Sequence, residues 1–377
     1  ASTIHLNHPR GSLGGFTYLQ VDTDTLATHA DPREFNMAVQ PGSSGADTLL
    51  LSSDFNAMEI LNSGVDEYLE PLVRPMLNDW FTLLSRGQLV AGTGTSDTHK
   101  KFADAAGYYR SFVKVGVDTP AEFHPLDLCD AVNAMKVVAT NTPFVKTTAV
   151  RVNAQGQPTS PVAELGDVLE PSTDDVEVTV QVQVPEFTDI SRIELYTWRP
   201  GDDGRCPMDP TSAQAKTTRV ACNGVENKNW PQASIAATRA VTLTSANLVN
   251  VRTVGSTTYR RWQTTQKFRL AAPATDNWIV ALVYGSKSIF PLVYKASSSG
   301  GSEPVTPFAM SNPILVDADG GGYDKPPFNT SLPPLKGPVP PPPQKTVPLV
   351  REPPSPERLL EVWGDAFSHT GGRGAVQ

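Results

Sequence analysis

Residues 176–184 (VEVTVQVQV) alternate apolar and polar side chains over nine positions. This is the period of a β-strand with one buried and one exposed face, because successive side chains of a strand point to opposite sides. Four further segments after residue 150 have the composition of short strands, and no helical pattern competes with them: 193–198, 240–243, 257–270 and 278–283. Short strands separated by turn residues predict an antiparallel β-sandwich over residues 151–323.

Residues 1–150 have a different pattern, in which short strands alternate with helices. Apolar residues recur every three or four positions from Pro75 to Arg86, and Gly87 follows as a helix terminator. A second helix is predicted at 126–135, and strands are predicted at 4–7, 57–61, 89–91 and 137–140. This order indicates an α/β domain with a parallel sheet or barrel, whose chemistry lies where strands end. We place a domain boundary near residue 150.

The C-terminal region, residues 324–377, is rich in proline. Residues 324–356 contain 13 prolines in 33 positions, a composition typical of an extended polyproline II tail. Ser355-Pro356-Glu357 then resembles a helix start, and the apolar residues of 359–367 fall near helical spacing. This short amphipathic helix would either fold back on the body or dock onto a partner.

Charge and hydropathy exclude two classes of partner. The chain has 31 basic and 39 acidic residues and a formal net charge of −8, and no local basic cluster was recognised that would favour nucleic acid or an anionic membrane. The longest strongly apolar stretch, 278–284, is far shorter than the roughly 20 residues of a membrane-spanning helix. We therefore expect a soluble protein with no membrane span.

Three segments of the first domain carry residues suited to chemistry. His8 follows the first strand in Asn7-His8-Pro9-Arg10, and Asp97 and His99 follow the Gly-rich exit at 92–94, where small residues would allow a sharp turn. Glu59 and Asn62 end another strand. Imidazole and carboxylate groups at neighbouring strand ends form a ligand set suited to zinc, manganese or iron. The alternatives are a simple turn at His8, an Asx-turn at Asp97 and an ion pair at Glu59.

Two nearby features are set aside. His5 lies three residues before His8, and on a strand the two would point to opposite faces, so His5 is interpreted as a bystander. Asp317-Ala318-Asp319-Gly320 opens like a calcium loop but lacks the later glutamate of an EF-hand, so we interpret it as a turn.

The order of NHPR, MEILNS, LVAGTGTSDTHK and GYYRSFV resembles the C-terminal half of the polymerase and histidinol phosphatase (PHP) superfamily, in particular its carbaryl-hydrolase-like bacterial branch. Asn141-Thr142-Pro143-Phe144 resembles the exit of that family into a β-sandwich, with Thr142 in place of the usual glycine. The resemblance implies a partial distorted (βα)7 barrel over residues 1–150, followed by the antiparallel sandwich. It also implies a site with two or three divalent metal ions.

The resemblance implies a role for individual residues. His8, Asp97 and His99 match metal ligands, and Arg110 of GYYRSFV matches a pocket arginine that would contact an oxyanion. Glu59, Asn62 and Arg10 are the remaining pocket candidates. Members of the family hydrolyse phosphoesters or related bonds, so the implied activity is metal-dependent hydrolysis of a small-molecule ester.

The N-terminal motifs of a complete PHP domain are missing, since no two of the six histidines form His-x-His. The resemblance then implies a piece of a longer precursor. The alternative is a noncatalytic exported binding or cell-envelope protein with a degenerate metal site. A disulfide between Cys206 and Cys222 would fit export, so a periplasmic or secreted location is expected.

Overall fold

The computed structural model describes residues 2–9, 16, 55–62, 74–98, 106–198, 235–289, 295–296, 302–303 and 305–326. All of them belong to the first of two contact units, residues 1–336, and the second unit comprises residues 337–377. The predicted proline-rich tail beyond residue 326, the helix at 355–367 and the Cys206–Cys222 pair lie outside the described residues. No helix in the described part of the chain is long and apolar enough to cross a membrane.

The N-terminal part forms a three-stranded parallel sheet. Its strands are β1 (His5–Leu6), β2 (Ala57–Asn62) and β3 (Ala91–Thr95), in the order β1-β2-β3. Helix α2 (Arg74–Ser85) connects β2 to β3 and buries Trp80 and Phe81 completely. β2 is buried at every position, as expected for a parallel strand covered on both sides.

The largest sheet has eight strands. Its members are β4 (Arg110–Val113), β5 (Val137–Thr140), β7 (Val168–Leu169), β9 (Arg192–Thr197), β10 (Ile235–Ala240), β13 (Asn277–Tyr284), β16 (Phe308–Ser311) and β17 (Ile314–Val316). The main path runs β10-β9-β13-β16-β5-β4, while β17 pairs with β13 and β7 pairs with β17. Helix α3 (Pro125–Asn133) connects β4 to β5, and a small separate pair is formed by β14 (Lys295–Ala296) and β15 (Ser302–Glu303).

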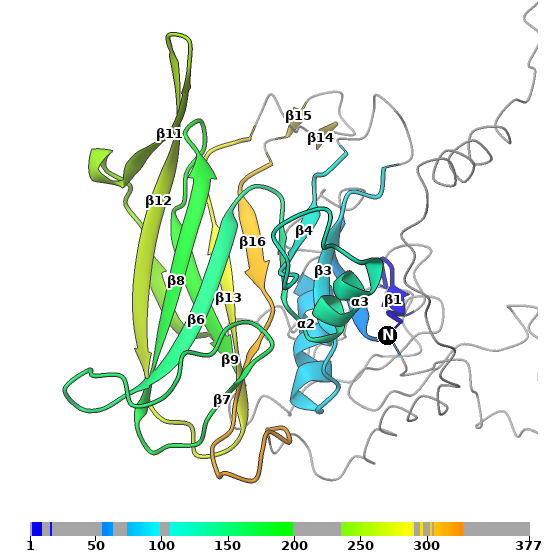
Figure 1. Ribbon diagram of the computed structural model, residues 1–377, viewed down its shortest axis with the longest axis vertical. Coiled ribbons are helices and arrows are strands. Elements are labelled where there is room, and N and C mark those ends of the chain that lie inside the picture. Colours follow the sequence, from blue (N-terminus) through cyan, green and yellow to red (C-terminus); the bar gives the residue numbers. More distant parts are fainter. Residues whose placement is uncertain are drawn as a thin grey trace, which may run out of the picture. The chain divides into compact units, whose positions relative to one another are not determined.

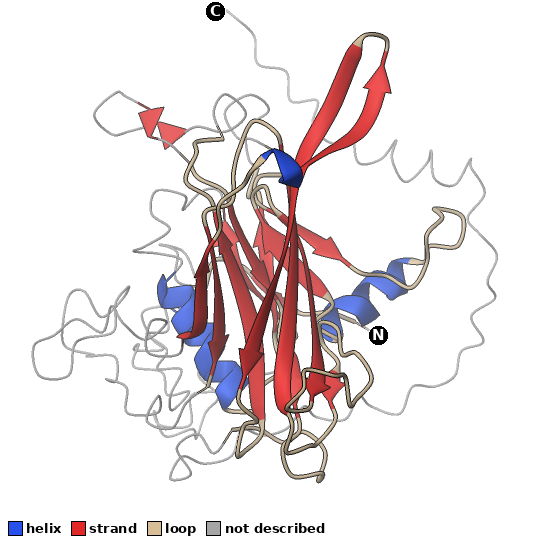
Figure 2. Ribbon diagram, turned by 90° about the vertical axis from the view of Figure 1, so that its left-hand side faces the viewer, coloured by secondary structure: helices blue, strands red, loops and turns tan. Residues whose placement is uncertain are grey.

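A four-stranded antiparallel sheet faces the large one (Figures 1 and 2). Its order is β11-β12-β8-β6, with β6 (Phe144–Val152), β8 (Asp175–Pro185), β11 (Leu248–Val254) and β12 (Thr257–Leu270). A 3₁₀ turn, η5 (Ser245–Asn247), precedes β11. The alternating valines 176–184 of β8 are all buried and pack with residues of β9, β13 and β17 in one core. The apolar core between the two sheets therefore contains the residues of β8 that the period-2 pattern predicted to be buried.

A second core lies on the other side of the eight-stranded sheet. The ring of Phe81 on α2 stacks on Trp278 of β13 at 4.8 Å and lies 5.5 Å from Tyr196 of β9. Buried residues of β2, α2 and β3 join residues of β13 and β16 in this core. The parallel sheet and its helix thus form a third layer, which Figure 1 shows on the side of β16 away from β8.

The predicted partial (βα)7 barrel is wrong. Apart from the single helical residue Phe16, α2 and α3 are the only α-helices within the described ranges, and no described strand after β3 joins the parallel sheet. Instead β4 pairs antiparallel with β5, from Arg110 opposite Thr140 to Val113 opposite Val137. β5 in turn pairs with β16, so both strands belong to the large mixed sheet. The boundary predicted near residue 150 falls within β6.

Candidate functional site

Four of the predicted site residues, His8, Glu59, Asn62 and Asp97, lie on or just after strands of the parallel sheet, and Glu59 of the middle strand β2 is the central group. Its side chain is only 1% exposed. One carboxylate oxygen accepts a hydrogen bond from the backbone N–H of His8, and the other accepts from the hydroxyl of Thr95 on β3. Among the described residues no ion pair of Glu59 with a basic residue, the alternative that the sequence suggested, is seen. Glu59 therefore connects β2 to the end of β3 and to the turn after β1.

His5 also belongs to this cluster, contrary to its interpretation as a bystander. Its Nε2 lies 2.6 Å from Oγ1 of Thr93, whose hydroxyl donates to the carbonyl of Met58 at 3.1 Å. The pKa of the His5 imidazole is below its ordinary value because protein atoms exclude water from part of the ring, although the charge of Glu59 acts in the opposite direction.

His8 and Asp97 share an unusual backbone conformation. Their φ angles are 28° and 44°, in the left-handed region that residues with a Cβ rarely adopt. Each residue lies two positions after the end of a parallel strand, His8 after Leu6 of β1 and Asp97 after Thr95 of β3. Such conformations persist where surrounding contacts hold them, and at His8 the contact is the N–H bond to Glu59.

Arg110 lies on β4 and does not contact Glu59 in the described part of the structure. Its Nη1 donates to the carbonyl of Gly107 at 2.9 Å, and its guanidinium lies over the rings of Tyr108 and Phe112. The neighbouring Ser111 links β4 to β3 through hydrogen bonds to both backbone groups of Gly94. Asn62 is buried at the end of β2, while Arg10 and His99 lie outside the described residues.

The described residues at these strand ends do not by themselves form a metal centre. Among the residues that the structure describes, the only group of three ligand-type side chains with donor atoms within 4.8 Å is Asp276, Asp317 and Asp319. His8, Glu59 and Asp97 therefore do not meet at one point, and the predicted ligand trio is incomplete here because His99 is not described.

The three aspartates could hold a cation, but they already accept backbone hydrogen bonds. Asp317 accepts from the N–H groups of Asp319, Gly320 and Gly322, at 2.8 to 3.1 Å. Asp276 accepts from two further backbone N–H groups. These bonds are those of a tight bend at residues 317–320, as the sequence interpretation expects.

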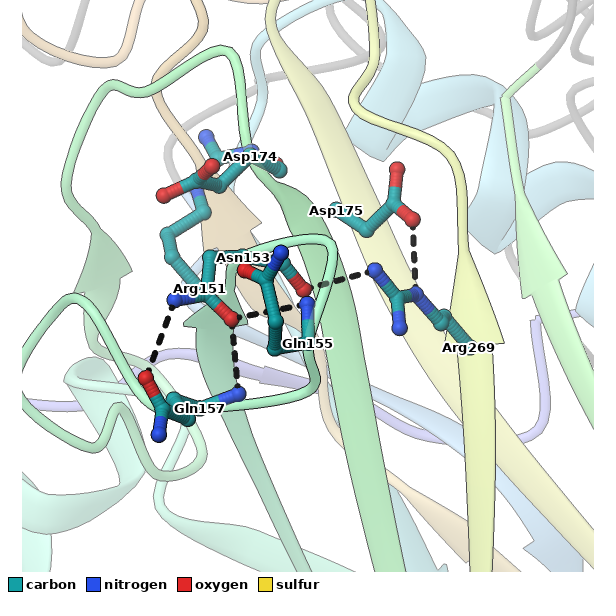
Figure 3. Close-up of polar contacts among 7 residues, drawn as sticks. All are labelled: Arg151, Asn153, Gln155, Gln157, Asp174, Asp175 and Arg269. Atoms are coloured by element: carbon teal, nitrogen blue, oxygen red, sulfur yellow. Dashed lines mark hydrogen bonds and ion pairs between the residues drawn. The ribbon is translucent and has the colours of Figure 1, made fainter.

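A separate polar cluster lies near one end of β6 (Figure 3). Arg151 is completely buried, and its guanidinium donates to the carbonyls of Glu170, Asp174 and Asp317 at 2.9 to 3.3 Å. Arg269 of β12 bridges the carboxylate of Asp175 and the carbonyl of Asn153, both at 2.7 Å. Both arginines bind groups of the protein itself, so this cluster is structural.

Comparisons of the chain with protein-family models, with curated proteins and with solved structures found no match.

Proposed function

We propose that this chain is part of a metal-dependent hydrolase of the PHP type, acting on a small phosphoester or a related ester. The proposal rests on one observation, the buried carboxylate of Glu59 on β2, which accepts hydrogen bonds from the backbone of His8 after β1 and from Thr95 at the end of β3. Hydrogen bonds or a bound cation must compensate the burial of such a carboxylate, and the described residues supply two hydrogen bonds. The residues on either side, His5, His8 and Asp97, are the ligand types of zinc, manganese or iron.

Side chains of this chain would hold the strands around the proposed substrate pocket in place. Glu59 fixes the backbone of His8, and Ser111 fixes β4 against β3, so the strand ends keep their spacing. Arg110 would have to leave the carbonyl of Gly107 to reach an anionic substrate. An exported location and divalent transition-metal cofactors are parts of the same proposal.

The test is metal content by elemental analysis of the purified chain. Stoichiometric zinc, manganese or iron that is lost in both Asp97→Ala and His99→Ala is the expected result. The control is His124→Asn, which replaces the exposed imidazole at the start of α3 with another capping side chain and should leave the metal in place. Metal loss in the control, or no metal in the parent chain, would contradict the proposal.

The second candidate function is a noncatalytic exported binding protein with a degenerate site. It is favoured by the absence, among the described strand-end residues, of three ligand atoms within one coordination shell. Elemental analysis and an activity assay together separate the two candidate functions. A degenerate site predicts neither bound metal nor turnover of p-nitrophenyl phosphate.

A further inference from the structure

β11 and the start of β12 form a two-stranded ribbon, residues 248–260, that extends beyond the rest of the four-stranded sheet (Figure 2). β8 pairs with β12 only from Arg261 onward, so residues 257–260 pair with β11 alone. β11 has no second partner among the described strands. Its outer edge therefore presents unpaired backbone N–H and carbonyl groups.

The ribbon is basic in an acidic protein. No Asp or Glu occurs between Glu226 and Asp276, and this segment contains Arg252, Arg260 and Arg261, while the whole chain has a net charge of −8. Seven uncharged residues separate Arg252 from the adjacent pair Arg260 and Arg261, so the sequence alone does not show a cluster. The two-stranded register brings them onto one short ribbon.

The arginines differ in whether their charge is already paired. Arg260 forms an ion pair with Glu186, with 3.0 Å between Nε and Oε2. Arg252 forms no ion pair with any described residue. Arg261 donates from Nη2 to Gln263 at 3.3 Å, and its buried Nε has no hydrogen-bond partner in the described part of the chain.

The unpaired charges lie on one face together with apolar side chains. Val249 lies opposite Arg261, Arg252 opposite Tyr259, and Val254 opposite Thr257, and directly opposed residues of an antiparallel pair share a face. Val254 is 47% exposed and Tyr259 is 56% exposed. An isolated two-stranded ribbon is at best marginally stable in water, so exposed apolar residues on it indicate a surface that a partner covers.

We propose that the outer edge of β11 binds an extended acidic segment of a partner protein, which adds to the sheet as a further strand. Its backbone would continue the hydrogen-bond ladder, and a carboxylate beside Arg252 would complete the charge pairing. Charge complementarity selects this occupant, because a second copy of the ribbon would bring its own Arg252 against this one. A nucleic acid offers phosphates but no backbone groups to continue the ladder. The inference is independent of the proposed hydrolase.

The experiment measures fluorescence anisotropy of labelled probes with the full chain at low salt. The probe is a synthetic octapeptide of alternating Glu and Val, and the comparison peptide alternates Lys and Val. The acidic peptide should bind, and Arg252→Gln should weaken it about tenfold, as expected for one charge-assisted hydrogen bond. Arg252→Lys should restore part of the affinity.

Two controls make the result specific. Arg239→Gln removes another exposed positive charge, from β10, and should leave the affinity within about twofold, because Arg239 contacts Gln266 and Phe268 of β12, outside the ribbon. An acidic peptide that is N-methylated at every second residue should not bind, since it cannot continue the ladder. Equal binding of the methylated peptide, insensitivity to Arg252→Gln, or tighter binding of an oligothymidylate than of the acidic peptide would each overturn the proposal.

Discussion

Arg151 is a charged side chain with no exposed surface, and its position is explained by three backbone carbonyls rather than by an ion pair. Burial lowers the pKa of its guanidinium, and the nearby Asp174 and Asp317 act in the opposite direction. The planar guanidinium can donate in several directions at once, which an ammonium group on a flexible stem cannot match. Arg151 therefore ties β6 to the segments that follow β7 and β17.

Arg151→Lys should lower the free energy of unfolding by about 3 kcal/mol, because carbonyls in a buried site lose their donors. Urea denaturation followed by circular dichroism measures this change. Arg269→Lys is the matched control, since Arg269 is partly exposed and its loss should cost under about 1 kcal/mol. Equal effects of the two substitutions would mean that burial of Arg151 does not determine its contribution.

At the level of elements, periodicity predicts those strands and helices whose buried positions are apolar. β8, β9, β12 and β13 and both helices were predicted close to their observed bounds. β6 was missed because two of its buried positions are Thr147 and Arg151, which hide the alternation. β11 was missed because it has no fully buried position that could leave a pattern.

The site was only partly predictable for a related reason. Strand alternation placed His5 and His8 on opposite faces, but β1 ends at Leu6 and His8 has a left-handed φ. Gly92 and Gly94 were expected to turn the chain after a strand, yet both lie inside β3. A Cβ at Gly92 would come within 2.7 Å of Met310 and 2.9 Å of Trp80, so the glycine allows close packing there. Such contacts between segments that are distant in sequence cannot be recognised from the residues next to Gly92.

The loop between β6 and β7 carries a pH-dependent contact. A hydrogen bond from Lys114 holds the pKa of Glu164 below its ordinary value, and Lys146 adds to this effect. A lowered carboxyl pKa stabilises the fold above the unfolded-state pKa of roughly 4.3 and loses that contribution as pH falls through the lower folded-state value.

Glu164→Gln should therefore lower the unfolding free energy at pH 7, but by less than about 1 kcal/mol because the lysines are solvent-exposed. The difference from the parent chain should shrink below roughly pH 4 and vanish once Glu164 is protonated in both states. Thermal denaturation across this pH range measures it. A difference that grew toward acid pH would contradict the assigned direction.

For the molecule as a whole, the buried side chain of Asn312 joins the parallel sheet to the large one, in addition to the bonds of Ser111. Asn312 accepts a hydrogen bond from the N–H of Gly92 and donates to the carbonyls of Gly92 and Val137, all at 2.8 Å. It follows β16 and links β3 to β5, although it lies 220 residues after Gly92 and 175 residues after Val137 in the sequence.

Asn312→Ala should lower the free energy of unfolding by about 2–4 kcal/mol, because the buried N–H and carbonyl of Gly92 lose their side-chain partner, whereas the carbonyl of Val137 keeps its bond from the backbone N–H of residue 312. Hydrogen exchange should show the largest loss of protection in β3. The control Asn250→Ala removes an exposed amide from β11 and should change the unfolding free energy by less than about 0.5 kcal/mol. Unchanged protection at β3 would contradict the role given to Asn312.

The bonds made by Asn312 also constrain the order of events during biosynthesis. Gly92 leaves the ribosome about 220 residues before its hydrogen-bond partner, and β13 and β16, which pack on α2, are likewise made late. The apolar faces of β2, α2 and β3 therefore stay exposed to solvent until nearly all of residues 1–316 have been synthesised. Contacts so distant in sequence slow folding and expose intermediates to aggregation. We therefore expect a nascent chain arrested before β16 to bind a chaperone.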